Sequence, residues 1–416
     1  MELVRRAARE SGYKHSARRV QERAGDSSDS GQHPGDPDRS FRPDVEGLRA
    51  VAVCLVVLFH AGVPGLGGGY VGVDVFFVIS GFVITRVLLK RIGSSGRPYF
   101  GEFYARRSRR ILPAAGLVVL VTVFATYRWL GFIRGDEVAN DARWVAVFLG
   151  NFHFAAQGTN YLAGQLPPSP LQNFWSLGVE EQFYLIYPAA LAVVCLVGRR
   201  FTIQSRLLVF TAVIFIVSYW WSIHYTSVNG PAAFFSTFTH AWELAIGGFI
   251  AAGDGIWKRL NPVVAALLAW LGLIAVLLAG THFSTGTQYP GWIAILPVGG
   301  TALVVIGGFK ASVGGAEVFL GARPMRWIGK ISFSIYLWHW PILSIAGEDA
   351  SKPLRLADKL CLVAVSVLLA AATYYAIENP VRRSRLLAKH RVLSIALGLV
   401  IVVMMLSFAT YKIRVL

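Results

Sequence analysis

Residues 49–60 read RAVAVCLVVLFH, a hydrophobic stretch that begins with Arg49 and ends with His60. In a helix, eleven residues correspond to about three turns and a rise of roughly 16 Å, so both side chains share one face. Ionisable residues are costly inside a membrane and usually mark a functional site. The alternative is that Arg49 reaches the lipid headgroups and that His60 is an interfacial residue. The spacing favours a pair that handles a substrate crossing between two compartments.

The composition places the chain among membrane proteins. Of its 416 residues, 55% are hydrophobic and 15% are charged, and the mean hydropathy is +0.53. We therefore predict an all-α, polytopic transmembrane helix bundle rather than a soluble protein. Eleven stretches are long enough to cross the hydrocarbon core: 45–62, 70–89, 111–130, 174–197, 205–222, 236–253, 262–280, 291–309, 331–347, 359–377 and 392–410. Asn151 and His153 interrupt a shorter stretch, 141–156, for which we predict a re-entrant or interfacial segment.

The distribution of basic residues predicts how these helices are oriented in the cell membrane. With the N-terminus inside, about three quarters of the 40 Lys and Arg residues fall in cytoplasmic segments, as the positive-inside tendency requires. The C-terminus is then extracytoplasmic. We predict a disordered basic cytoplasmic tail at 1–40, a membrane domain of ten helices at 41–391, and an eleventh helix with a short extracytoplasmic end at 392–416.

The charge and the cysteines exclude two classes of partner. The net charge of +17 does not indicate nucleic-acid binding, because the basic residues are spread over cytoplasmic loops that face the anionic headgroups of the bilayer. Each of the three cysteines, Cys54, Cys195 and Cys361, lies inside a predicted membrane helix. Neither a disulfide framework nor a zinc site is indicated, and we expect no metal.

A glycine-rich hairpin and a carboxylate lie between the first two predicted helices. The sequence GGGYVGVDVFFVISGF occupies 67–82 and contains Asp74. No Gly-Lys-Ser/Thr follows, so the stretch is not a phosphate loop. Asp74 could orient His60 or form an ion pair with it across the hairpin. Alternatively, Asp74 is a carboxylate at a helix N-terminus that complements the helix dipole.

An arginine cluster precedes the third predicted helix. In YARRSRRILP, residues 104–113, the pairs Arg106 with Arg109 and Arg107 with Arg110 are each three residues apart. Residues with this spacing are neighbours on a helix, and two adjacent guanidinium groups suit the phosphates of a donor molecule. The alternative is ordinary anchoring by basic residues on the cytoplasmic side.

The fourth predicted helix carries two acidic residues. It begins FWSLGVEEQFYLIYP at 174–188, which places Glu180 and Glu181 inside an apolar segment, where acidic residues need partners. The candidate partners are the arginines inside other predicted helices: Arg49, Arg86 and Arg128. A catalytic role and a purely structural buried ion pair both remain open. Tyr184, one turn further on, is a candidate substrate contact.

The ninth predicted helix contains the aromatic sequence YLWHWP at 336–341. There Trp338 and His339 are candidates for lining a cavity that holds an acyl chain or a sugar. The alternative is a role in the aromatic belt or in packing.

These motifs, in this order, resemble those of the acyltransferase-3 family of integral-membrane acyltransferases. The resemblance rests on Arg49 with His60, GVDVFFVISGF, FYARRSRRILP, FWSLGVEEQFYLIYP, SFSIYLWHWP and ENP, and it runs from about residue 41 to 391. It implies ten core helices. It also implies transfer of an acyl group, most often acetyl, from cytoplasmic acyl-CoA to a hydroxyl of an extracytoplasmic carbohydrate or glycolipid of the cell envelope.

The resemblance also assigns roles to residues. The family's essential Arg and His correspond to Arg49 and His60, and its Arg-x-x-Arg pair corresponds to Arg107 and Arg110, or to Arg106 and Arg109. We expect the arginine cluster to bind the phosphates of CoA. We expect His60 to act as general base on the acceptor hydroxyl, or to carry the acyl group as an acyl-imidazole.

The end of the chain departs from one pattern in this family. Members with an eleventh helix commonly continue into an extracytoplasmic SGNH-hydrolase-like domain, whereas this sequence stops at KIRVL. The alternatives are a piece of such a fusion, direct acylation of the acceptor, or a separate partner that completes the transfer. A polytopic transporter or lipid flippase is the other functional class that fits intramembrane Arg, Glu and His. It leaves the arginine pairs unexplained.

Overall fold

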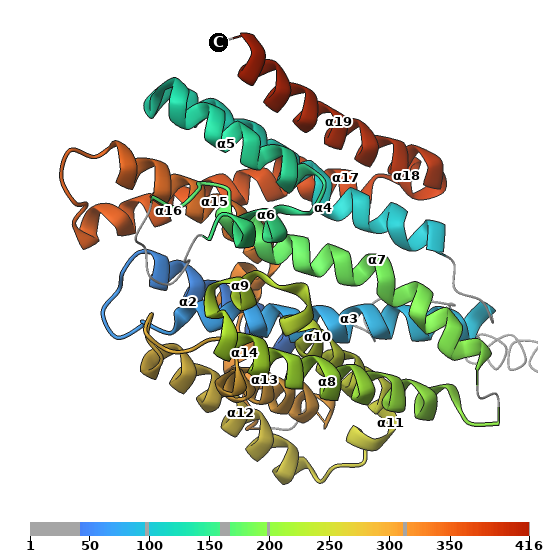
Figure 1. Ribbon diagram of the computed structural model, residues 1–416. Helices are drawn as coiled ribbons and strands as arrows, with labels where there is room; N and C mark the ends of the chain where they lie inside the picture. Colours follow the sequence, from blue (N-terminus) through green and yellow to red (C-terminus); the bar gives the residue numbers. More distant parts are fainter. Residues whose placement is uncertain (1–41, 96–99, 159–166, 198–199, 311–313, 416) are drawn as a thin grey trace, which may run out of the picture. The chain divides into compact units, whose positions relative to one another are not determined.

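The computed structural model describes residues 42–95, 100–158, 167–197, 200–310 and 314–415, and within them the chain is helical without any strand (Figure 1). The α-helices are α2 (Pro43–His60), α3 (Gly72–Ser95), α4 (Phe100–Trp129), α5 (Gly131–Ala146), α6 (Gly150–Ala156), α7 (Trp175–Leu196), α8 (Ile203–Val228), α9 (Gly230–Phe235), α10 (Thr237–Ala252), α11 (Asp254–Trp257), α12 (Pro262–His282), α13 (Ile295–Gly307), α14 (Glu317–Leu320), α15 (Arg323–Asp349), α16 (Leu356–Thr373), α17 (Asn379–Arg383), α18 (Arg385–Lys389) and α19 (Arg391–Val415). Short 3-10 turns form η2 (Gly69–Val71), η3 (Gln172–Phe174), η4 (Trp292–Ala294) and η5 (Gly308–Lys310), and a π-helical turn forms η6 (Tyr374–Glu378). The predicted all-α class is confirmed.

Each of the eleven predicted spans is helical, and eight helices in the described part of the chain are long and apolar enough to cross a membrane. These eight are Gly69–Ile92, Phe100–Trp129, Gln172–Leu196, Ile203–Val228, Pro262–His282, Trp292–Lys310, Leu356–Lys389 and Arg391–Tyr411. The other three predicted spans fall on α2, α10 and α15. Helix α2 carries Asp44, Glu46 and Arg49, and α10 has only 16 residues. The chain is a multi-pass membrane protein, while the count of eleven stays a prediction.

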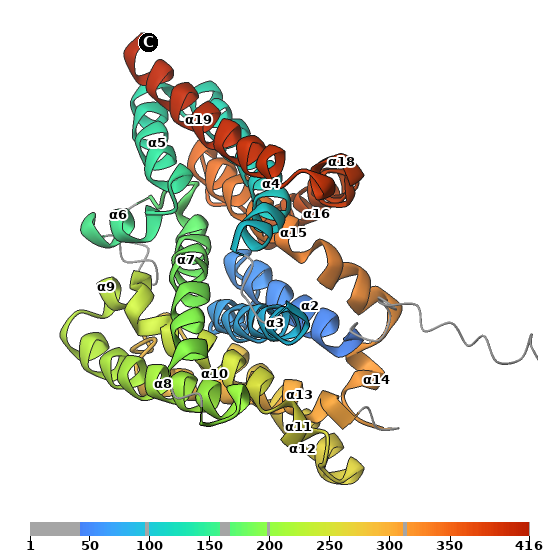
Figure 2. The ribbon, with the colours of Figure 1, turned by 90° about the vertical axis from the view of Figure 1, so that its right-hand side faces the viewer.

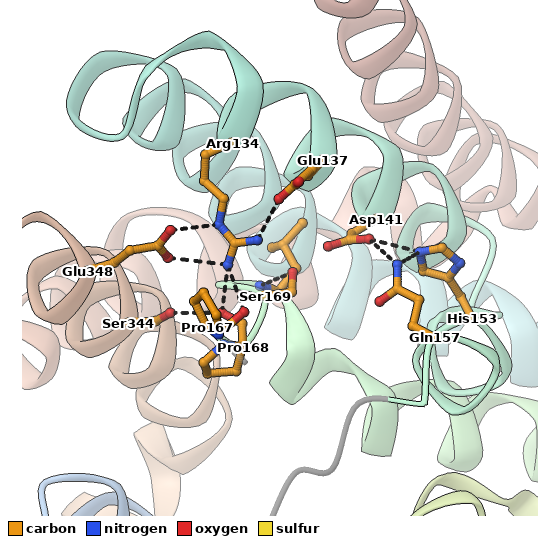
Figure 3. A network of polar contacts seen from close by, with 11 residues as sticks. Arg134, Glu137, Asp141, His153, Gln157, Pro167, Pro168, Ser169, Ser344 and Glu348 are labelled. Carbon is orange, nitrogen blue, oxygen red and sulfur yellow. Dashed lines mark hydrogen bonds and ion pairs between the residues drawn. The ribbon is translucent and has the colours of Figure 1, made fainter. Parts of the chain in front are cut away.

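The interrupted stretch at 141–156 is not one segment. Helix α5 begins earlier, at Gly131, and ends at Ala146, and the short helix α6 follows it. Between the two helices Phe148 has a φ of 59°, in the left-handed region that a bulky residue rarely adopts. Two polar side chains of this stretch bond to each other: His153 Nε2 lies 2.8 Å from Asp141 Oδ1 (Figure 3). The interfacial location of the segment stays a prediction.

Helices α2 and α3 lie in the middle of the bundle. Figures 1 and 2 show α8, α10, α12 and α13 on one side of them and α4, α5, α15 and α19 on the other. Glycines allow the closest contacts, as in many membrane helix pairs. A Cβ atom at Gly329 of α15 would lie 1.8 Å from the Glu46 carbonyl oxygen of α2, and one at Gly81 of α3 would lie 1.9 Å from the Leu244 oxygen of α10. This packing fixes α2 against α15, the helix that carries His339.

Candidate active site

His60, the last residue of α2, is paired with His339 of α15. His60 Nδ1 lies 3.0 Å from His339 Nε2, and the two rings are stacked with centroids 5.2 Å apart. The ring centroids of Trp340 and His60 are 4.6 Å apart. His339 is fully buried, whereas His60 is partly exposed. His339 is therefore a hydrogen-bond partner of the predicted base His60, and its contact with substrate stays a prediction.

The backbone defines which nitrogen of each imidazole carries the hydrogen. His339 Nδ1 lies 3.2 Å from the carbonyl oxygen of Ile335, which can only accept. The Nδ1–H group of His339 therefore donates to Ile335, and its Nε2 accepts from the Nδ1–H group of His60. In this tautomer the basic lone pair of His60 is on Nε2.

His60 lines a cavity of about 390 Å³, here called the His60 cavity. Its other lining residues, of which three are polar, are Pro167, Pro168, Trp340, Leu343, Ser344, Gly347, Glu348, Pro353, Leu354 and Lys359. Apolar and aromatic walls with a few polar groups are typical of small-molecule sites. The cavity can accept a group of the size of a sugar ring next to His60.

Arg134 of α5 holds one wall of the His60 cavity in place (Figure 3). Its guanidinium lies 2.9 Å from Glu348 and donates to the carbonyl oxygens of Pro167 and Pro168 at 3.0 and 3.1 Å. Burial opposes the charge of Arg134, but the carboxylates of Glu137 and Glu348 raise the pKa of the guanidinium above its ordinary value. The contacts of Arg134 thus join α5, residues 167–168 and the end of α15, which are far apart in the sequence.

A second cavity, of about 360 Å³, contains six arginines and is called the arginine cavity. The arginines are Arg49, Arg106, Arg107, Arg109, Arg110 and Arg382, and the polar and aromatic lining includes Ser80, Glu180, Tyr184 and Tyr336. All four arginines of the predicted cluster therefore face one space. They lie inside α4, because this helix begins at Phe100 and not at the predicted residue 111.

Arg49 points into the arginine cavity and not toward lipid headgroups. Its Nε donates to Ser332 Oγ of α15 at 3.2 Å. Arg109 is 6% exposed, and its Nε and Nη1 atoms are buried without a hydrogen-bond partner among the described residues. Buried guanidinium groups that lack partners are costly unless an anion completes the site. The arginine cavity is thus suited to a phosphate-bearing ligand.

Glu180 and Glu181 form an ion-pair cluster with Arg107, which is not one of the three predicted partners Arg49, Arg86 and Arg128. Arg107 bonds to Glu181 and lies 3.3 Å from Glu180, and its guanidinium carbon stands 3.6 Å from the centre of the Tyr184 ring. Ser80 donates a further hydrogen bond to Glu180 at 2.9 Å. Arg107 therefore has structural partners, and Glu180 and Tyr184 line the arginine cavity, while their roles in the reaction stay predictions.

Asp74 lies in a different cluster from the predicted one. The hydrogen-bond partner of His60 is His339, whereas Asp74 of α3 lies with His240 and Glu243 of α10. The nearby Tyr289 hydroxyl is buried, and burial together with the Asp74 and Glu243 carboxyls raises the pKa of this phenol well above its ordinary range. The described contacts of Asp74 therefore join α3 to α10, and of the two alternatives for Asp74 they give no support to a pairing with His60.

Neither Trp338 nor His339, the two candidates on α15, lines the His60 cavity or the arginine cavity. Trp338 is 6% exposed and its indole donates to Thr373 of α16 at 2.9 Å, and it lines neither of the two cavities. Its neighbour Trp340 lines the His60 cavity instead. The missed residues His240 and Glu243 have a visible signal, because both are ionisable groups inside the apolar stretch 236–253.

Together, the fold and the two cavities define a multi-pass helical membrane protein with ionisable groups at both ends of one central helix. Residues 42–377 match the family described as "Acyltransferase domain". The chain belongs to this family of acyltransferases, so the expectation drawn from the motifs is confirmed.

Three curated relatives extend the comparison. The chain is 31% identical over 364 residues to "Peptidoglycan O-acetyltransferase OatA" of Listeria monocytogenes, covering 83% of this chain and 56% of that protein. It is 32% identical over 369 residues to "Putative peptidoglycan O-acetyltransferase YrhL" of Bacillus subtilis, covering 82% and 55%. It is 28% identical over 356 residues to "O-acetyltransferase OatA" of Staphylococcus aureus, covering 82% and 57%. The chain thus spans little more than half the length of these relatives. No solved structure matches it.

Proposed function

We propose that this chain transfers an acetyl group from cytoplasmic acyl-CoA to a hydroxyl group of an envelope glycan. One observation carries the proposal: Arg49 and His60, three turns apart on α2, line two separate cavities that suit a donor and an acceptor. In this arrangement the N-terminus is cytoplasmic and the C-terminus is extracytoplasmic.

The arginine cavity binds the donor. Six guanidinium groups face it with Glu180 as the acidic lining residue, so a ligand with several phosphate charges, such as CoA, is attracted there. Arg109 offers buried donor atoms that have no hydrogen-bond partner in the part of the chain that the structure describes. The acyl-bearing arm of the donor then extends past Arg49 along α2 toward His60.

His60 acts as the general base. Its Nε2 takes the proton of the acceptor hydroxyl while the hydroxyl oxygen attacks the thioester carbonyl carbon. The carbon–sulfur bond then breaks, and the departing CoA thiolate receives the proton from His60. His339 keeps the Nδ1–H tautomer of His60 through this cycle, as the third member of a catalytic triad does for its histidine.

The acceptor lies in the His60 cavity. Trp340 offers an aromatic face beside His60, and Glu348 and Lys359 offer polar groups for hydroxyls. The printed names of the relatives, two of which refer to peptidoglycan, favour an envelope glycan as the acceptor class. A separate extracytoplasmic transferase that passes the acetyl group onward is an additional partner in this scheme.

The test uses membranes that carry the full chain, supplied with acetyl-CoA labelled in the acetyl group. We expect glycan labelling to fall at least a hundredfold in His60→Gln, in line with the contribution of about 10²–10⁴ from a general base. His153→Gln is the matched control, because it also removes a histidine that bonds to a polar partner, but outside both cavities. Equal labelling in wild type and His60→Gln at equal protein level would contradict the proposal. Substrate movement without CoA consumption would support the transporter class instead.

A further inference from the structure

A buried cluster next to the start of α3 has the composition of a metal site. We infer that Asp74, His240 and Glu243 bind one divalent cation of the Zn²⁺ or Mn²⁺ type. Their ligand atoms all lie within 4.8 Å of one another, and the three residues are 2%, 1% and 0% exposed. The site lies outside both cavities and is independent of the proposed acyl transfer.

His240 is oriented as a ligand. Its Nε2 lies 2.9 Å from the carbonyl oxygen of Phe234, which can only accept, so Nε2 carries the hydrogen. His240 Nδ1 then lies 2.7 Å from Glu243 Oε1, a separation at which a proton or a cation must lie between the two atoms. Histidines that bind metals commonly donate their other ring N–H to a backbone carbonyl in this way.

Three oxygen atoms in the cluster have no hydrogen-bond partner among the described residues: Asp74 Oδ1, Glu243 Oε2 and the hydroxyl of Tyr289. Tyr289 is 2% exposed, and its hydroxyl faces the Asp74 carboxyl. Buried polar atoms without partners are rare in folded proteins and call for an unseen ligand, water or ion. A cation between these groups gives each of them a partner.

The charge of the cluster favours a divalent cation. No arginine or lysine in the described part of the chain forms an ion pair with either carboxylate. A single proton shared by His240 and Glu243 would leave the negative charge of the Asp74 carboxylate uncompensated. Burying an uncompensated charge in a site that excludes water is costly in free energy. Two carboxylates, one neutral imidazole and one divalent cation have no net charge.

The ligand set also indicates the role. Imidazole nitrogen with carboxylate oxygen suits Zn²⁺ and Mn²⁺, and a site closed to solvent is structural and not catalytic. The ion would tie the first turn of α3, which follows the hairpin after His60, to α10 and to Tyr289 in the segment before η4. It would thus stabilise the packing of α3 against α10.

The first measurement is the metal content of the full chain, purified in detergent without added chelator, by inductively coupled plasma mass spectrometry. We expect about one Zn²⁺ or Mn²⁺ per chain in wild type and in the control His153→Gln, whose histidine bonds to a single carboxylate. We expect less than about a tenth of an equivalent in Glu243→Gln and His240→Gln. Equal content in wild type and both site variants would mean an adventitious ion only, and would overturn the inference.

A second measurement does not depend on the folding of any variant. Wild-type protein is stripped with a chelator, and Zn²⁺ or Mn²⁺ is added back singly while the melting temperature Tm is recorded. We expect Tm to rise by at least about 2 °C with the preferred ion, because a ligand that binds only the folded state stabilises it. An unchanged Tm with both ions would show that protons, and not a cation, neutralise the cluster, and would overturn the inference.

Discussion

Replacement of His339 tests the arrangement of the base. In His339→Phe an aromatic ring is kept, although a larger one, but the acceptor that Nε2 offers to the Nδ1–H group of His60 is removed. In His339→Gln a side-chain carbonyl oxygen can take the place of that acceptor. The two variants therefore separate the loss of the hydrogen bond from the loss of packing at a fully buried position.

The magnitude follows from the hydrogen bond that is lost. A buried donor left without its acceptor costs about 1–3 kcal/mol, and each 1.36 kcal/mol in the barrier is a factor of ten in rate. We expect kcat to fall about 5- to 150-fold in His339→Phe and by less than about threefold in His339→Gln. The KM for acyl-CoA stays unchanged in both, because the arginine cavity is at the other end of α2.

The assay is the initial rate of labelled acetyl transfer in membranes, measured over a range of acyl-CoA concentrations at equal protein level. The reasoning would be refuted if His339→Phe kept the wild-type kcat, or if His339→Gln lost as much as His339→Phe. A rise in the KM for acyl-CoA without a fall in kcat would place His339 in donor binding instead.

Three further variants test other parts of the structure. Arg107→Ala leaves two carboxylates without their partner and should lower the free energy of unfolding by about 3–5 kcal/mol; an unchanged Tm in detergent would contradict the structural role. Replacing Arg109 and Arg110 by Gln should raise the KM for acyl-CoA about tenfold or more while the KM for acceptor is unchanged; unchanged donor dependence would remove them from donor binding. Gly329→Ala, whose Cβ would clash with the backbone of α2, should cost about 1–3 kcal/mol. Gly101→Ala, which meets nothing within 4 Å, is its control, and equal Tm values for the two would refute the close packing.

The hydropathy of the sequence predicted where the membrane helices lie, because a membrane helix needs a long apolar stretch and such a stretch can be read from the local sequence alone. It missed the start of α4, since the arginine-rich turns after Phe100 are helical without being apolar. Spacing on one helix placed Arg49 and His60 on a shared face, but it could not show that they line two cavities. The separation into two cavities depends on the side chains that neighbouring helices contribute to each of them.

Partners between distant helices were the least predictable feature. A sequence gives the depth of a residue in the membrane but not the direction in which its helix turns it. Trp338 and Trp340 are two positions apart on α15, about 200° around the helix, so one packs on α16 and the other faces the His60 cavity. For the same reason Arg107, and not Arg86 or Arg128, reaches the Glu180 and Glu181 carboxylates.

The most direct test of acyl transfer between the two cavities compares membrane vesicles of opposite orientation. Labelled acetyl-CoA, which does not cross a bilayer, is added outside inverted vesicles or outside right-side-out vesicles that carry the wild-type chain. The account predicts that only inverted vesicles transfer label to glycan in their lumen, and that His60→Gln abolishes this transfer. Label on glycan when the donor meets only the extracytoplasmic face, or His60-independent labelling of the lumen, would contradict it.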